Sequence, residues 1–221
     1  MNFEVIETKE RVLADNDAAA AENRAALRRS GAFLVNLMAS PGAGKTTTLL
    51  RTIEALRNQH RIAVIEADAD GDVDAKAIAA SGIPVLQVHT GGSCHMDADM
   101  TRRALERLGT DYDLIFLENV GNLVCPAEFD VGADLRVMIL STPEGHDKPL
   151  KYPLMFQVSD VLLVNKTDVA SVFGFELDSL RQNVALRHPE MEILPISAKT
   201  GEGFKAWTDY LTAQIEGRSN G

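Results

Sequence analysis

Short runs of apolar residues alternate along this chain with longer segments in which apolar positions recur at helical spacing. The apolar runs predict strands at residues 32–38, 62–65, 85–88, 114–117, 135–140, 161–164 and 192–196. The periodic segments predict helices at residues 8–29, 45–58, 73–80, 96–108, 177–187 and 203–216. Strands that are apolar throughout and alternate with helices are typical of a parallel sheet. The pattern therefore predicts an α/β fold with a mostly parallel sheet flanked by helices on both faces.

The first predicted helix is rich in Ala, Glu and Arg and ends at Ser30-Gly31, where glycine is a typical helix stop. No stretch rich in Pro, Gly or Ser divides the remaining chain. We therefore expect an N-terminal helix within residues 1–31, followed by a single domain over residues 32–221.

The net charge of −10 arises from 22 basic and 32 acidic residues. This excess of negative charge argues against a nucleic acid or an anionic membrane as a partner. No run of about 18 apolar residues could span a membrane, and the first residues lack the apolar core of a signal peptide. We expect a cytoplasmic protein, whose thiols stay reduced.

A glycine-rich segment, Ala39-Ser40-Pro41-Gly42-Ala43-Gly44-Lys45-Thr46-Thr47, lies between the first predicted strand and a helix. This is the context of the phosphate-binding loop of P-loop NTPases. Backbone N–H groups from Gly42 to Thr47 would surround the phosphates. Lys45 would reach the β- and γ-phosphates, and Thr46 would bind Mg²⁺. The alternative is a strand-to-helix turn that binds no ligand.

Two further motifs predict that the nucleotide is GTP. Asn165-Lys166-Thr167-Asp168 follows a predicted strand, and the Asp168 carboxylate can accept hydrogen bonds from two donors of guanine. Adenine lacks that pair of donors and would leave the carboxylate unpaired. Asn165 would brace the loop, and the stem of Lys166 would lie across the base. Ser197, Ala198 and Lys199 follow the last strand and form the usual companion loop, which contacts the guanine O6.

The carboxylate on the Mg²⁺ side is less sharply defined by the sequence. Glu118 begins an E-N-V-G segment where GTPases often have D-x-x-G, and Asp68 and Asp70 are rival carboxylates after another strand. We take Lys45, Thr46, Asp68 and Glu118 as the catalytic set, with Thr46, Asp68 and Glu118 on the Mg²⁺ side. Asn122 stands where signalling GTPases have a water-orienting Gln, which predicts slow intrinsic hydrolysis.

The two cysteines of the chain, Cys94 and Cys125, follow different predicted strands, and His95 is next to Cys94. Two thiolates and an imidazole would suit Ni²⁺, Zn²⁺ or Cu⁺. Three ligands leave a coordination position open, which fits a site of metal transfer. The spacing alone equally allows two buried thiols and a surface histidine.

Six segments of the chain together resemble the HypB family of nickel-inserting GTPases, which belongs to the SIMIBI class of P-loop NTPases. The segments are S-P-G-A-G-K-T-T-T at 40–48, E-A-D at 66–68, G-G-S-C-H at 91–95, D-L-I-F-L-E-N-V-G-N-L-V-C-P at 113–126, N-K-T-D at 165–168 and S-A-K-T-G at 197–201. The resemblance implies a GTPase that matures [NiFe]-hydrogenase together with other maturation proteins and the hydrogenase large subunit. It also implies a GTP-dependent homodimer in which Cys94, His95 and Cys125 bind Ni²⁺ or Zn²⁺ between subunits.

Alternatives remain open at this point. The chain could be a regulatory GTPase with a structural zinc, or a urease-directed nickel GTPase, although the Cys-Pro-His motif of the latter is absent. Lys148 and Lys151 are expected in a solvated loop, or else at the GTP phosphates across a dimer. The sequence does not choose between nickel and zinc.

Overall fold

The computed structural model describes residues 8–109 and 111–219 and contains one seven-stranded, entirely parallel sheet. Its strands are β1 (Phe33–Ala39), β2 (Ile62–Asp68), β3 (Val85–His89), β4 (Leu114–Glu118), β5 (Leu135–Ser141), β6 (Val161–Asn165) and β7 (Glu192–Pro195). They lie in the order β3-β2-β4-β1-β5-β6-β7, so the strand before the glycine-rich loop is central. The α/β prediction is confirmed, with every predicted strand present.

The long helices also follow the prediction, with small shifts at their ends. They are α1 (Thr8–Ser30), α2 (Lys45–Leu56), α3 (Val73–Ala79), α4 (Ala98–Leu108), α8 (Leu177–Ala185) and α9 (Phe204–Ser219). The fourth helix begins later than predicted because Asp97 caps it, with its side chain accepting a hydrogen bond from the Met100 N–H at 2.7 Å.

Several short helices were not predicted. They are α5 (Cys125–Glu128), α6 (Lys148–Lys151), α7 (Pro153–Val158) and the 3₁₀ helices η1 (Thr142–Glu144) and η2 (Thr167–Phe173). The expected solvated loop at Lys148 and Lys151 is wrong, because a proline in the first turn and acidic partners support α6. Lys148 pairs with Glu144 at 3.7 Å and Lys151 with Asp147 at 2.6 Å. One or two turns are too short to show helical periodicity in a sequence.

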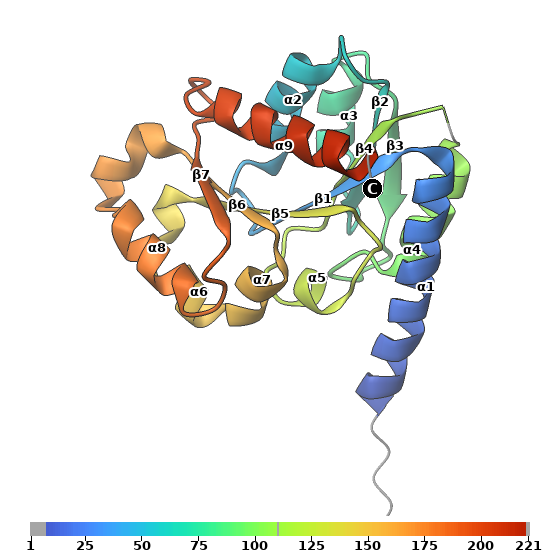
Figure 1. Cartoon of the computed structure of the whole chain (residues 1–221), viewed down its shortest axis with the longest axis horizontal. Coiled ribbons are helices and arrows are strands. Elements are labelled where there is room, and N and C mark those ends of the chain that lie inside the picture. Colours follow the sequence, from blue (N-terminus) through green and yellow to red (C-terminus); the bar gives the residue numbers. More distant parts are fainter. Residues whose placement is uncertain (1–7, 110, 220–221) are drawn as a thin grey trace, which may run out of the picture.

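Helices cover both faces of the sheet (Figure 1). Alternate side chains of β1 point to opposite faces. Phe33, Val35 and Leu37 pack with residues of α2, α3 and α9, whereas Leu34 and Met38 face the side of α1, α4, α5, α7 and α8. Both sets are buried, which explains why β1 is apolar except at Asn36.

Helix α1 lies beside α4, and its first turns project away from the sheet (Figure 1). In the ranges that the structure describes, no helix is both long enough and apolar enough to cross a membrane. Because the strands are parallel, the loops that follow them open at one edge of the sheet, where ligands of such folds bind. The predicted motifs follow β1, β2, β3, β4, β6 and β7 and therefore share that edge.

Candidate functional site

The glycine-rich loop joins β1 to α2 through glycines in the left-handed region. Gly42 has a φ of 73° and Gly44 a φ of 97°. A Cβ on Gly44 would lie 2.5 Å from the Asn165 side chain, so this position requires glycine. Helix α2 begins at Lys45 without a side-chain cap, so its first N–H groups are available to an anion. The geometry is that of a phosphate-binding loop.

Asn165 ties together the three segments predicted to bind the nucleotide. This side chain is 1% exposed, and its Nδ2 donates to the Ala43 carbonyl at 2.9 Å. Its Oδ1 accepts hydrogen bonds from the N–H groups of Lys166 at 2.8 Å and Ala198 at 3.0 Å. One buried amide therefore joins residues 39–47, 165–168 and 197–199, which we call the nucleotide corner.

The base-side residues of the nucleotide corner are also in contact. Lys166 adopts a φ of 64°, which is rare for a residue other than glycine, and its Nζ donates to the Gly42 carbonyl at 2.7 Å. The lysine stem thus crosses from the base side to the phosphate side. Ser197 Oγ donates to Asp168 Oδ1 at 2.7 Å, which orients the carboxylate predicted to recognise guanine.

Glu118 ends β4 next to the start of α2. Its Oε1 accepts a hydrogen bond from Thr46 Oγ1 at 2.8 Å, while its buried Oε2 has no partner among the described residues. Burial raises the pKa of Glu118 to about 7 and, together with the charge of Glu118, also raises the pKa of Glu66 on the adjacent strand to about 7. A hydroxyl beside an unpaired carboxylate oxygen fits Mg²⁺, which prefers hard oxygen ligands.

The other proposed Mg²⁺ carboxylate, Asp68, is engaged within its own loop. Asp68 Oδ1 accepts hydrogen bonds from the N–H groups of Gly71 at 2.6 Å and Asp70 at 3.0 Å. These bonds hold its pKa below the usual range. Because Lys45 also contributes to that lowering, Asp68 lies within electrostatic range of the phosphate-binding loop.

Cys94, His95 and Cys125 meet as the sequence suggested, with one donor atom of each lying within 4.8 Å of the others. The two Sγ atoms are 2.6 Å apart, and Cys94 Sγ lies 3.7 Å from His95 Nδ1. Within the described part of the chain, these residues form the one group of at least three clustered His, Cys, Asp or Glu ligands. We call this group the metal corner.

The surroundings of the metal corner favour an accessible soft-metal site. Cys94 is exposed and Cys125 half-buried. The His95 ring stacks on Phe129 with centroids 4.0 Å apart, and burial lowers its pKa, which favours the neutral imidazole that binds metals. The neighbouring thiol of Cys94 raises the pKa of Cys125, so metal binding must displace a proton.

Two asparagines that were not predicted as site residues link the segment after β4 to the loop that carries Cys94 and His95. Asn119 is fully buried, directly follows Glu118, and accepts a hydrogen bond from the Met96 N–H at 3.1 Å. Asn122 donates to the Cys94 carbonyl at 3.4 Å and accepts from the Val124 N–H at 2.8 Å. Both belong to the E-N-V-G-N segment, but the partners that link them to the other loop, Met96 and Cys94, are distant in the sequence and leave no local signal.

Comparison with known proteins agrees with this geometry. Residues 33–195 match the CobW/HypB/UreG nucleotide-binding domain. The chain is 46% identical over 211 residues to the hydrogenase maturation factor HypB of Azotobacter chroococcum mcd 1, covering 95% of this chain and 69% of that protein.

Two solved structures have the same fold with a TM-score of 0.85 each. HypB from Archaeoglobus fulgidus is 37% identical, with 91% of this chain and 99% of that chain covered. HypB from Helicobacter pylori in complex with nickel is 33% identical, with 91% and 95% covered. Such similarity along most of the chain extends well beyond the nucleotide-binding motifs.

Proposed function

This chain belongs to the HypB family, and from that premise we propose that it is a GTP-hydrolysing nickel metallochaperone for the maturation of [NiFe]-hydrogenase. The observation that carries the proposal is the placement of a thiol–imidazole cluster beside a P-loop nucleotide corner at one edge of one sheet. The sequence similarity to hydrogenase maturation factors supports the assignment to hydrogenase maturation. Its partners would be other maturation proteins and the hydrogenase large subunit.

In the nucleotide corner, Lys45 and the N–H groups of the glycine-rich loop would hold the phosphates of GTP. Thr46 and Glu118 would hold Mg²⁺, which when bound neutralises charge on the phosphate oxygens. Asp168, oriented by Ser197, would select guanine. Replacing Asp168 with Asn should shift binding from GTP toward xanthosine triphosphate, and equal binding of ATP and GTP by the unaltered protein would contradict the assignment.

In the metal corner, Cys94, His95 and Cys125 would bind the transported ion. The donor set suits Ni²⁺ and Zn²⁺, and the exposure of Cys94 allows the ion to pass to a partner. Two such clusters facing each other across a two-fold axis would complete a shared site. We therefore propose that the GTP-bound form is a homodimer that binds the metal between its subunits.

A short connection supports coupling between the two corners. Glu118 contacts Thr46 in the nucleotide corner, and the next residue, Asn119, contacts the backbone directly after His95. A Cβ on Gly121 would also lie 3.1 Å from the Pro41 ring, so this segment runs directly against the phosphate-binding loop. A movement at the phosphates would thus reach Cys125 through a few residues, as in GTPase switches.

The test is a nickel titration monitored together with molecular mass, in the presence of a non-hydrolysable GTP analogue or GDP. We expect the analogue to produce a dimer whose nickel affinity differs from that of the GDP form. Cys125→Ala should lose the metal and weaken the dimer while GTP binding survives. A dimer that binds zinc equally in both nucleotide states would instead support a regulatory GTPase with a structural metal.

A further inference from the structure

Helix α1 contacts the chain just beyond both loops of the metal corner. One buried stripe of this helix contains Asn16, Ala20, Asn23 and Leu27, which recur at helical spacing and share a face. An amphipathic helix would normally place apolar residues at all of these positions. The two asparagines therefore require partners for their buried amides.

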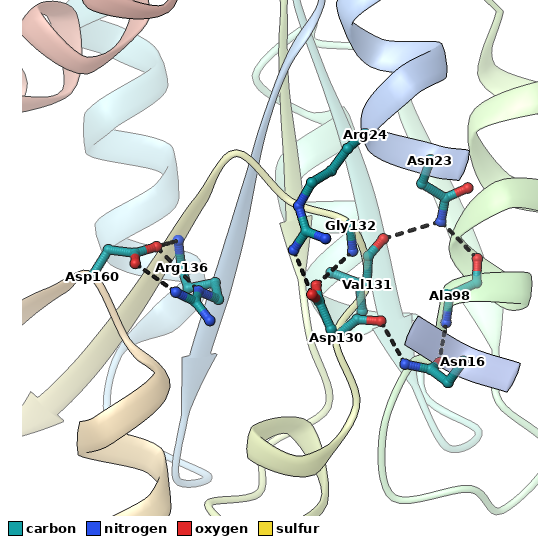
Figure 2. Close-up of polar contacts among 9 residues, drawn as sticks. All are labelled: Asn16, Asn23, Arg24, Ala98, Asp130, Val131, Gly132, Arg136 and Asp160. Carbon is teal, nitrogen blue, oxygen red and sulfur yellow. Dashed lines mark hydrogen bonds and ion pairs between the residues drawn. The ribbon is translucent and has the colours of Figure 1, made fainter. Parts of the chain in front are cut away.

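Those partners are backbone groups of two separate segments, shown in Figure 2. Asn16 Oδ1 accepts a hydrogen bond from the Ala98 N–H at 2.9 Å, and its Nδ2 donates to the Asp130 carbonyl at 2.8 Å. Asn23 Nδ2 donates to the Ala98 carbonyl at 2.8 Å and to the Val131 carbonyl at 3.0 Å. Each asparagine thus bridges the same two segments.

The bridged segments are continuations of the metal-binding loops. Ala98 is the first residue of α4, which begins shortly after His95, and Asp130 follows the short helix α5 that begins at Cys125. Arg24 of α1 adds an ion pair to Asp130. Held at Ala98 on one side and Asp130 on the other, the two loops are joined to one rigid helix.

The contact between α1 and the second segment is tight. A Cβ on Gly132 would lie 2.5 Å from the Ala20 carbonyl oxygen and 2.6 Å from the Asn23 Cβ. The helix therefore lies directly against the backbone, and a small displacement of α1 would move the whole segment.

We infer that Asn16 and Asn23 are positioning residues for the soft-metal site, setting the separation between the Cys94–His95 loop and the Cys125 segment. This inference rests on the proposed metal-binding function. The asparagines touch no donor atom of the site; they act through the backbone that carries the donors. Residues that orient metal ligands commonly affect metal affinity.

The test uses the full chain with Asn23→Ala or Asn16→Ala, titrated with nickel and, separately, with cobalt(II). We expect the dissociation constant for nickel to rise by about tenfold, and the cobalt absorption bands, which report coordination geometry, to change shape. GTP affinity should stay within about twofold of the unaltered protein, because the described hydrogen bonds of Asn16 and Asn23 go to Ala98, Asp130 and Val131, outside the nucleotide corner. Unchanged metal affinity and spectra in folded variants would overturn the inference.

Asn183→Ala is the matched control. Asn183 also lies on a helix and donates to a backbone carbonyl, that of His146, at 2.9 Å, but it belongs to α8. It should lose stability in urea and leave the metal properties unchanged. A loss of nickel affinity in Asn183→Ala equal to that in Asn23→Ala would show a general effect of destabilisation and overturn the inference.

A metal-free measurement separates this inference from the proposed function. Dibromobimane becomes fluorescent when it links two neighbouring thiols, so its reaction reports the proximity of Cys94 and Cys125. We expect slower cross-linking in the α1 variants at an unchanged rate of single-thiol alkylation. If the unaltered protein binds no nickel, the proposed function fails, while unchanged cross-linking refutes the positioning role. Should Asn23→Ala not fold, Asn16→Ala, which retains the contacts of Asn23, decides the question.

Discussion

The nucleotide corner and the metal corner share one edge of the sheet but are held in different ways. The nucleotide corner is braced from within, because buried Asn165 joins its three segments directly. The two loops of the metal corner are joined more weakly, because the exposed Asn122 reaches the Cys94 carbonyl through a hydrogen bond of 3.4 Å. They are held further by Asn119 where β4 ends and by α1 on the other side.

This difference separates a preorganised site from an adjustable one. Phosphate binding depends on several N–H groups pointing at one place, so an internal brace reduces the cost of ordering the loop. A site that must accept and release an ion benefits from ligands whose spacing follows neighbouring elements. The exposed Cys94 is consistent with that second design.

The largest effect is expected from a substitution that disables the nucleotide corner alone. Lys45→Ala should reduce GTP hydrolysis by about 100-fold or more, because a positive charge aimed at the phosphates is lost. Nickel binding by the nucleotide-free protein should be retained. Phosphate release and a nickel titration on the same sample measure both. Loss of nickel binding together with hydrolysis would mean that the corners are not separable.

Removing the internal brace should affect stability as well as binding. Asn165→Ala leaves the Ala43 carbonyl and the Ala198 N–H without their partner, and should lower the free energy of unfolding by about 2–4 kcal/mol. Urea unfolding and a GTP titration check this expectation. Asn183→Ala removes a single hydrogen bond that is less buried, and it should lower the free energy of unfolding clearly less. An equal cost for the two variants would argue against a special bracing role for Asn165.

Metal binding at the metal corner should depend strongly on pH. The pKa of the Cys125 thiol is raised above its ordinary value, so at neutral pH the thiol must lose its proton to bind nickel. Affinity should therefore rise by about tenfold per pH unit for each proton released between pH 6 and 8. Titrations at several pH values measure the slope. In Cys125→Ser the slope should become shallower, and a pH-independent affinity would exclude thiolate ligation.

The smallest expected effect concerns the ion pair of α1. Arg24 and Asp130 are partly exposed, so Arg24→Ala should change the free energy of unfolding by about 1 kcal/mol or less. Nickel affinity should change much less than in Asn23→Ala, since the buried amide contacts of α1 remain. Urea unfolding with a nickel titration tests the contrast. A larger loss of nickel affinity in Arg24→Ala than in Asn23→Ala would show that the ion pair, and not the buried amides, holds α1 to the metal-binding loops.

The sequence alone was enough to predict the strands, the long helices and the motif positions, because these depend on local properties. An apolar run such as that of β1 can only be buried, and the glycines of residues 42–44 encode a turn that few other residues adopt. The meeting of Cys94, His95 and Cys125 was one of two readings that the spacing allowed. Only the adjacency of the loops in the folded chain brought their donor atoms together.

Tertiary structure decided which polar side chains brace the two corners. Asn165 was expected to brace its own loop, but its contacts with Ala43 and Ala198 depend on the neighbouring loops of the sheet. Asn16 and Asn23 lie in an Ala-rich helix whose sequence contains no trace of their partners about a hundred positions away. A side-chain amide that binds a distant backbone group leaves no recognisable pattern in the sequence, because a residue of almost any type can provide the backbone N–H or carbonyl.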